Sequence, residues 1–231
     1  MTLGSPRVHR RRTGSTNADA RALAIAGAPH GTLVTALEQH DGRGRQGRRW
    51  YAPPARALLC SLVIRDPPLL LPLAAAVAVA ELAGPRALLK WPNDVLLDGR
   101  KVSGILIEGR PQERWSVLGI GVNVAVRLEE LPEEIRASAG TLGLDADAIE
   151  PSLARLLALL EDWLEQPEDE ILAAWSARDA LRGAEVTWAG GHGRGAGIDD
   201  RGRLRVRLDD GTEQLLDAGE VHLVDAASAG A

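Results

Sequence analysis

The pattern of apolar and polar positions predicts two structural regions, with a change near residue 181. Before this point, short apolar runs typical of buried strands alternate with stretches of helical periodicity. Strands are expected at residues 31–38, 57–65, 88–91, 95–97, 102–108 and 116–126, and helices at residues 15–26, 72–83, 152–163 and 168–181. Asp98-Gly99, between two of these strands, is typical of a tight hairpin turn. Residues 128–147 are polar and are expected to form a mobile connection.

Beyond residue 181 the pattern becomes one of short strands separated by turns. Strands are expected at residues 185–188, 195–198, 203–208, 213–216 and 221–224. Such a series predicts a small β-barrel. Within 203–208 apolar residues alternate with arginines, which predicts one core face and one basic, solvated face. The predicted class is α+β, with a first domain over residues 1–181, a second over 182–231, and a frayed tail at 226–231.

Composition narrows the class of protein. The 231 residues carry a net charge of −5, which argues against a protein that only coats nucleic acid. A single cysteine, Cys60, excludes an intrachain disulfide, and its apolar neighbours predict a buried, inert thiol. The first residues do not resemble a signal peptide, and the longest apolar stretch, residues 69–82, contains Pro72 and Glu81. We therefore expect a soluble, cytoplasmic protein without a membrane partner.

Lysine use singles out one region of the chain. Only Lys90 and Lys101 are lysines, against 25 arginines. Arginine offers a planar fork, whereas lysine is a compact point charge that reaches one oxygen in a confined space. Two lysines eleven residues apart in an arginine-biased chain indicate that this segment needs the geometry of an ammonium group.

An arginine-rich loop precedes this segment. Residues 42–49 hold four arginines among three glycines. Arginine forks match phosphate and carboxylate oxygens, and glycines let a loop close over a ligand. A flexible basic surface loop or an RNA contact is the alternative. The loop also fits the dinucleotide pattern G-x-G-x-x-G, but Pro53-Pro54 shortly after it exclude the long helix that this pattern must open.

Four further groups of polar residues and glycines allow both a structural and a functional reading. Ser15, Thr16 and Asn17 are favoured at helix starts, and Thr16 with Asp19 has the spacing of a capping box. The same side chains could instead bind a small polar group. Asn93-Asp94 is either a turn or a ligand for Mg²⁺.

The other two groups lie in strands. Gly104 permits close approach to the backbone of a strand. Asn123 follows Gly119 and Gly121 within an apolar strand, which indicates either a ligand-binding edge or a β-bulge.

Taken together and in this order, the motifs resemble the biotin–protein ligase family. The resemblance rests on Gly14-Ser-Thr-Asn17, Gln39 with Gly42-Arg-Gly-Arg-Gln-Gly-Arg-Arg-Trp50, Lys90-Trp-Pro-Asn-Asp-Val95, Gly99-Arg-Lys-Val-Ser-Gly-Ile-Leu-Ile-Glu108 and Gly119-Ile-Gly-Val-Asn-Val124. It implies a mixed-sheet catalytic domain of the biotin/lipoate ligase type and an SH3-like second domain. No helix-turn-helix precedes Ser15, so the resemblance is to members without a DNA-binding domain, and no DNA binding is expected.

The resemblance implies a two-step reaction with biotin, ATP and Mg²⁺. Biotin is activated as biotinyl-5′-AMP and passed to a lysine of a biotin carboxyl carrier protein. The implied catalytic residues are Lys101, Arg45 and Asp94. The implied biotin site is Ser15, Thr16, Asn17, Gln39, Arg43, Gly44, Arg45, Lys101 and Gly104. The implied ATP site is Arg43, Arg45, Lys90, Asn93, Lys101 and Asn123, with Asp94 as the Mg²⁺ ligand.

Three questions of function stay open at this point. A homodimer joined at a sheet edge is common in such relatives. A lipoate–protein ligase or octanoyltransferase shares the same fold, although the transferase would need a catalytic cysteine in a polar setting. A non-catalytic nucleic-acid-binding protein would use the arginine loop but would leave Lys90, Asn93, Asp94 and Asn123 unexplained.

Overall fold

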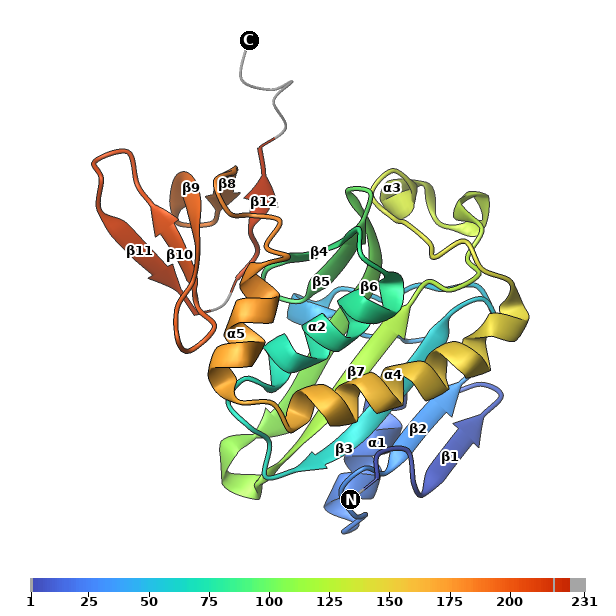
Figure 1. The fold of residues 1–231 in the computed structure, drawn as a ribbon. Helices are drawn as coiled ribbons and strands as arrows, with labels where there is room; N and C mark the ends of the chain where they lie inside the picture. Colours follow the sequence, from blue (N-terminus) through green and yellow to red (C-terminus); the bar gives the residue numbers. More distant parts are fainter. Residues whose placement is uncertain (1, 218, 225–231) are drawn as a thin grey trace.

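The computed structural model describes residues 2–217 and 219–224, so the predicted tail at 226–231 lies outside the described residues. The larger sheet has seven strands in the order β1-β2-β3-β7-β6-β5-β4 (Figure 1). Their bounds are β1 Arg7–Arg10, β2 Leu33–Ala36, β3 Leu58–Arg65, β4 Ala87–Lys90, β5 Asp94–Leu97, β6 Arg100–Arg110 and β7 Trp115–Val122. β1 and β2 are parallel and the other pairs are antiparallel, which makes the sheet mixed as predicted.

Helices cover both faces of this sheet because the central strands are apolar on both sides. In β3, Leu58, Cys60, Leu62 and Ile64 enter the main core, whereas Val63 faces the other side. The main core is closed by α2 (Leu71–Ala83), α4 (Ile149–Leu164) and α5 (Glu168–Ser176). α1 (Thr16–Ile25) lies on the opposite face, where its alanines pack on Val63 (Figure 1).

Most predicted elements are confirmed, with shifted ends. The expected helix at residues 168–181 ends at Ser176, and the one expected at 152–163 begins earlier, at Ile149. Strand β1 was not predicted, because Arg7–Arg10 contains one apolar residue and reads as polar. It forms by pairing with β2 at the edge of the sheet, where polar side chains reach water.

The segment at residues 128–147 is not a free connection, contrary to the prediction. It contains η3 (Leu128–Glu130), α3 (Glu133–Arg136) and η4 (Ala146–Ala148). Leu131 is buried, and Ser138 and Gly140 exchange backbone hydrogen bonds of 2.8 and 2.7 Å with Lys101. A few buried apolar groups and this short parallel bridge hold the segment against the start of β6.

The second sheet has five antiparallel strands in the order β11-β10-β9-β8-β12. Their bounds are β8 Glu185–Trp188, β9 Gly191–Ile198, β10 Leu204–Arg207, β11 Glu213–Leu216 and β12 His222–Leu223. Leu204 and Val206 are fully buried and belong to the same continuous core as the larger sheet. The SH3-like description and the boundary at residues 181 and 182 stay predictions.

The predicted arginine face of this second sheet carries its own counter-charges. Arg205 and Arg207 both pair with Glu213, at 2.7 and 3.4 Å, and Arg194 pairs with Glu185 at 3.1 Å. The positive charge available to an external anion is therefore small. Among the described residues, no helix combines the length and apolar character needed to cross a membrane.

Candidate functional site

A cavity of about 460 Å³ lies on the sheet face that carries α1, beyond the start of that helix. Its walls come from the first turn of α1, the arginine loop, the β4–β5 corner, the beginning of β6, the glycines of β7 and residues 131–139. β12 of the second sheet and the two residues before it, 220–223, also reach the cavity. Every site residue predicted from the sequence lines this one cavity, although these residues are spread from position 15 to position 123.

The polar residues at the start of α1 do not cap the helix. In the described structure the Ser15 side chain makes no capping hydrogen bond, and Asp19 accepts one from Thr13 instead, at 2.9 Å. The capping-box reading is therefore wrong. The backbone N–H of Thr16 donates to Gln39 Oε1 at 2.7 Å, and its hydroxyl lies 3.1 Å from the same oxygen. These side chains are free to shape the cavity because the helix end does not use them.

Beneath this end of the cavity lies a buried polar network. Asn17 donates from Nδ2 to Glu108 at 2.8 Å, and its Oδ1 lies 2.6 Å from the hydroxyl of Ser61. Ser61 is fully buried in β3 and also lies 2.8 Å from the hydroxyl of Thr16. Thr16, Asn17 and Ser61 are at most 4% exposed, so their polar groups depend on one another and on the partly exposed Glu108 for hydrogen bonds.

Glycines in two adjacent strands make room at the floor of the cavity. A Cβ on Gly119 would stand 2.0 Å from Asn17 Oδ1, and one on Gly121 would stand 2.5 Å from the Trp50 ring. Gly104 is paired with Gly121 across the two strands and lies under the same ring. The ladder through β7 keeps continuous register against both neighbours, so the β-bulge reading of this segment is wrong.

A tight turn and a bulge together bring Lys101 into the cavity. Asp98 and Gly99 both have positive φ, at 51° and 76°, which confirms the predicted hairpin turn. The register between β5 and β6 then shifts so that Val95 pairs with Ser103 but Leu96 pairs with Lys101. In a regular strand, residues three apart face opposite sides. The extra residue lets both Lys101 and Gly104 line the cavity.

The ammonium group of Lys101 lies between a carboxylate and an aromatic ring. Its Nζ is 2.6 Å from Asp94 Oδ1 and 5.8 Å from the centre of the Trp50 ring. The ion pair is partly shielded from solvent, with 35% and 20% of the two side chains exposed. A compact cation fits this space, which agrees with the choice of lysine here.

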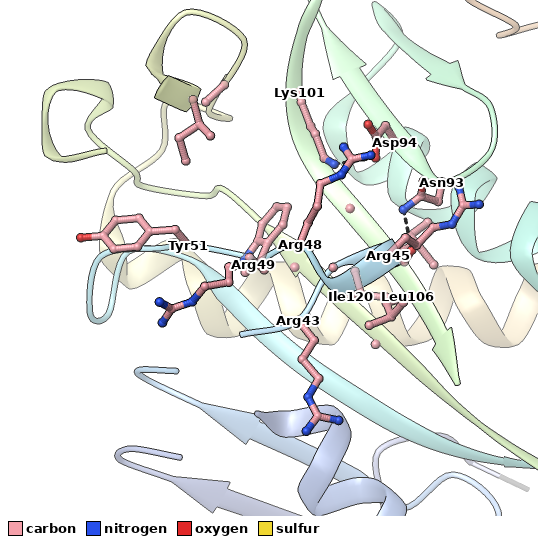
Figure 2. A pocket seen from close by; sticks show the side chains of 18 of the residues that line it. Arg43, Arg45, Arg48, Arg49, Tyr51, Asn93, Asp94, Lys101, Leu106 and Ile120 are labelled. Atoms are coloured by element: carbon pink, nitrogen blue, oxygen red, sulfur yellow. Dashed lines mark hydrogen bonds and ion pairs between the residues drawn. The ribbon is translucent and has the colours of Figure 1, made fainter. Parts of the chain in front are cut away.

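The arginine loop is held by a different partner at each arginine. Arg45 donates to Asn93 Oδ1 at 3.2 Å (dashed line in Figure 2), and Arg48 forms an ion pair with Glu220 of the second sheet. Arg43 points toward the other end of the cavity, 3.9 Å from Glu108. Arg49 is turned away and donates to the carbonyl of His40. The loop contains a 3₁₀ turn at Arg45–Gly47 rather than the start of a long helix, which agrees with rejecting the dinucleotide-binding pattern.

The cations of this region are crowded and partly buried. Burial is the main cause that lowers the pKa of Arg45, and the nearby Arg48 lowers it further while Asp94 acts against the shift. Burial also lowers the pKa of Lys90, where Asp94 again opposes the shift and Lys101 and Arg48 reinforce it. A cluster of this kind favours an anionic ligand, which would relieve the repulsion.

Asn123 lies just beyond the end of β7 and is 4% exposed. Its Nδ2 donates to the carbonyl of Gly140 at 2.8 Å, whereas its Oδ1 has no hydrogen-bond partner within the described part of the chain. The side chain lines the cavity, so the structure offers Oδ1 as an acceptor there. By contrast Cys60 is buried and burial raises the pKa of its thiol to about 12, which confirms the predicted inert thiol.

Sequence reasoning gave no role to four residues that shape the cavity. Trp50 and Glu220 line it, and Ser61 and Glu108 hydrogen-bond to the lining residues Thr16 and Asn17. Ser61 had a detectable signal, because it is the only polar residue in the run Leu58–Ile64 apart from Cys60. The second sheet also supports the site from behind: Trp91 Nε1 donates to the carbonyl of Gly202 at 3.0 Å, next to Lys90 and Pro92.

The comparisons with known proteins agree with this geometry. Residues 10–124 match the biotin/lipoate A/B protein ligase family, and residues 191–224 match the biotin protein ligase C-terminal domain. The fold is that of this class of ligase.

Relatives and solved structures narrow the class. A biotin–[acetyl-CoA-carboxylase] ligase of Paracoccus denitrificans is 39% identical over 91% of this chain and 97% of its own length. The corresponding ligase of Mycobacterium tuberculosis is 36% identical over 90% of this chain and 85% of its own. The structure of the biotin protein ligase from Aquifex aeolicus in complex with biotin and ATP is 29% identical, has a TM-score of 0.78, and covers 95% of this chain and 99% of that one.

The chain belongs to the biotin protein ligase family. The family and the mixed-sheet fold predicted from the sequence are thereby confirmed, and with them ATP-dependent biotin ligation as the activity of the family. The biotin reading is favoured over the lipoate alternative.

Proposed function

We propose that this protein activates biotin with ATP in the cavity described above and transfers it to a lysine of a biotin carboxyl carrier protein. One observation carries the proposal: a single cavity joins an uncharged, buried polar end at α1 to a cationic end at Lys101 and the arginine loop. Biotin has the matching form, with a neutral cyclic urea at one end and a carboxylate at the other.

In the first step, a biotin carboxylate oxygen attacks the α-phosphorus of ATP, and the bond to pyrophosphate breaks. Two anions must approach, so fixed cations are the main catalytic requirement. We assign Lys101 to the carboxylate and the α-phosphate together and Arg45 to the phosphate. Arg43 would join them when the loop rearranges and turns this side chain away from Glu108. Lys90 and Asn93 are assigned to the triphosphate and Asn123 to the adenine. The proximity of these side chains within one cavity supports the assignment.

In the second step, the acceptor amine attacks the acyl carbon of biotinyl-5′-AMP, the carbon–oxygen bond of the mixed anhydride breaks, and AMP leaves. Water must be excluded until the amine arrives. The arginine loop is suited to this because Arg45 and Arg48 reach across the cavity to Asn93 and Glu220. Ser15, Thr16, Asn17, Gln39, Gly44 and Gly104 form the proposed biotin end.

Mg²⁺ would arrive with the nucleotide rather than occupy a cage of side chains. Among the described residues, no three histidine, cysteine, aspartate or glutamate side chains converge to hold an ion. Asp94 lines the cavity and would be the one protein carboxylate, with phosphate oxygens and water as the other ligands. This donor set fits Mg²⁺, which would neutralise charge on the leaving pyrophosphate.

Location, oligomeric state, DNA binding and domain boundaries are predicted from the sequence alone. A cytoplasmic location, a homodimer, the lack of DNA binding and the division into domains 1–181 and 182–231 stay predictions. The nucleic-acid-binding alternative gains no support from the second sheet, whose arginines are paired with acidic side chains.

Calorimetric titration tests the proposal. Biotin and lipoate are each titrated into the purified protein, with and without a non-hydrolysable ATP analogue. We expect tight binding of biotin, weak or no binding of lipoate, and a change in biotin affinity when the nucleotide is present. Binding of neither acid would contradict the proposal, and equal binding of both would move the substrate assignment toward lipoate.

A further inference from the structure

Ser61 occupies an unusual position beneath the uncharged end of the cavity. It is fully buried in β3, and its hydroxyl lies 2.6 Å from Asn17 Oδ1 and 2.8 Å from Thr16 Oγ1. A hydroxyl has one proton, so it can donate to only one of these two oxygens. Which oxygen receives the proton decides what the cavity offers to a ligand.

Glu108 settles the orientation of the Asn17 amide. A carboxylate only accepts hydrogen bonds, and Glu108 Oε2 lies 2.8 Å from Asn17 Nδ2. The carbonyl of Leu106, at 3.4 Å from the same nitrogen, is a second acceptor on that side. The NH₂ group must therefore face Glu108, and Oδ1 must face Ser61.

The direction of the remaining hydrogen bonds follows from this orientation. An amide oxygen has no proton, so Ser61 must donate to Asn17 Oδ1. The Ser61 proton is then used, so Ser61 Oγ, 2.8 Å from Thr16 Oγ1, is left only as an acceptor for Thr16. The one proton of Thr16 points either to Ser61 Oγ or to Gln39 Oε1, at 3.1 Å, and both acceptors belong to the protein. In either arrangement Thr16 Oγ1 keeps lone pairs for a ligand in the cavity.

Gln39 is oriented by an independent contact. Its Oε1 accepts the backbone N–H of Thr16 at 2.7 Å, so its Nε2 is the end that lies toward Gly42. Both Thr16 and Gln39 line the cavity. The cavity wall thus offers a hydroxyl oxygen with free lone pairs next to an amide group whose oxygen is already occupied.

We propose that Glu108 and Ser61 are positioning residues that fix the direction of the hydrogen bonds running through Asn17 to Thr16. Thr16 is thereby held as an acceptor for a ligand N–H. This inference rests on the proposed function, because the N–H groups would be those of the biotin urea. The dithiolane ring of lipoate has no N–H, so the same arrangement selects between the two acids.

We call the chain of hydrogen bonds from Glu108 through Asn17 and Ser61 to Thr16 the relay. Two substitutions interrupt it at different points. Ser61→Ala removes the central hydroxyl. Glu108→Gln lets the Asn17 amide turn, because a glutamine side chain can present either an oxygen or an NH₂ group. Glu108 is 3.9 Å from Arg43, so the ion pair lost by this substitution is a weak one. Ser103→Ala is the matched control: Ser103 is also fully buried, on β6, and its hydroxyl has no partner among the described residues.

The measurement is the affinity for biotin, for desthiobiotin, which keeps the urea but lacks the thioether, and for a non-hydrolysable ATP analogue. Ser61→Ala and Glu108→Gln are each expected to weaken binding of both ureas about tenfold or more, the effect of one hydrogen bond. The affinity of Ser61→Ala for the ATP analogue should stay within about twofold, because Ser61 contacts none of the residues assigned to ATP. In turnover, KM for biotin should rise while kcat is kept. The double variant should be no worse than about the worse single one, since both act on one relay.

The outcomes separate the relay from the proposed function. Unchanged affinity for biotin in both variants overturns the relay, as does an equal loss in Ser103→Ala. Failure of the unsubstituted protein to bind biotin rejects the proposed function instead. If Ser61→Ala does not fold, Glu108→Gln tests the same relay from its partly exposed end.

Discussion

The two ends of the cavity are built from side chains of opposite kinds. At the α1 end, Thr16, Asn17 and Ser61 are uncharged, nearly or fully buried, and joined to one another. At the other end, Lys90, Lys101 and Arg45 are charged and partly open to solvent, and their contacts reach to loops and to the second sheet. The hydrogen bonds of a buried network are fixed when the protein folds, whereas a cationic loop can rearrange when an anion binds.

The difference indicates that the buried end selects the substrate and that the cationic end promotes the reaction. Selection between neutral rings needs fixed donors and acceptors in a dry place, where an unmade hydrogen bond costs most. Joining two anions needs positive charge close to the reacting atoms. From the largest expected effect to the smallest, three predictions change the cationic end, and one compares the buried network with the arginine loop.

The largest effect is expected at Lys101. Lys101→Arg keeps the charge, but it replaces a compact ammonium 2.6 Å from Asp94 with a longer, planar group whose charge lies elsewhere in the cavity. We expect the barrier to adenylation to rise by about 2–4 kcal/mol, the range for losing one preorganised charge contact. Biotin-dependent pyrophosphate release measures this. Arg100→Lys, on an exposed neighbour, is the control, and near-normal release by Lys101→Arg would refute the argument from lysine geometry.

Arg45→Ala should convert the protein into one that loses its intermediate. The substitution removes the contact with Asn93, and a hydrogen bond from a charged group contributes about 1.5–3 kcal/mol. We expect roughly tenfold more free biotinyl-5′-AMP in solution, measured by chromatography of the products. Arg49→Ala is the matched control, because this side chain lies in the same loop but donates to the carbonyl of His40 and does not contact Asn93 (Figure 2). Equal release by both variants would remove the loop from the proposed mechanism.

Alanine substitutions at two glycines of β7 compare how well the buried network and the arginine loop accommodate an added methyl group. Gly119→Ala would place a methyl group 2.0 Å from Asn17 Oδ1, an atom held by Ser61 from one side. Gly121→Ala would meet Trp50, at 2.5 Å, on a loop that can shift. We expect Gly119→Ala to lower the free energy of unfolding by about 1–3 kcal/mol and Gly121→Ala to lower it less. Denaturant unfolding of the two variants gives the order, and the reverse order would mean that the network is the softer region.

The smallest effect is expected at Lys90, where substitution should raise the free energy of unfolding instead of lowering it. Burial lowers the pKa of Lys90, so at neutral pH the folded protein holds a partly buried charge. Lys90→Met should raise the free energy of unfolding by about 0.5–2 kcal/mol while weakening ATP binding, a trade-off common at functional sites.

The pH dependence of this effect follows from the direction of the shift. Below the lowered pKa, Lys90 is charged in both states and its destabilisation is complete. As the pH rises from the lowered pKa toward the ordinary value of 10.5, the folded protein loses the proton first, so stability increases. The advantage of Lys90→Met should therefore shrink at high pH. An advantage that grows with pH would contradict the burial argument.

Much of the fold and of the site was predictable from local patterns. The order of strands and helices follows from apolar periodicity, and the hairpin at Asp98-Gly99 follows from the conformational freedom of those residues. The loop arginines and the two lysines indicated an anion site, and the β7 glycines with Asn123 indicated a ligand-binding edge, because these residue types have little reason to occur in such patterns otherwise. The family was predictable because these motifs occur together in one order.

Other features depended on contacts between distant parts of the chain. Strand β1 exists because an edge accepts polar residues, and the segment at 128–147 is ordered because Ser138 and Gly140 bond to the backbone of Lys101. Ser15 and Thr16 looked like capping residues because local sequence cannot show that Gln39 and Ser61 offer better partners.

By itself, the sequence determined which chemical groups are available and in which elements they lie, since these depend on residue type and on local periodicity. Only the tertiary structure decided which groups meet. A one-residue register shift turns Lys101 into the cavity beside Gly104, and the second sheet brings Glu220 to Arg48. Both outcomes depend on packing between segments far apart in the chain, and hydrogen-bond direction in the buried network depends on neighbours that no local pattern contains.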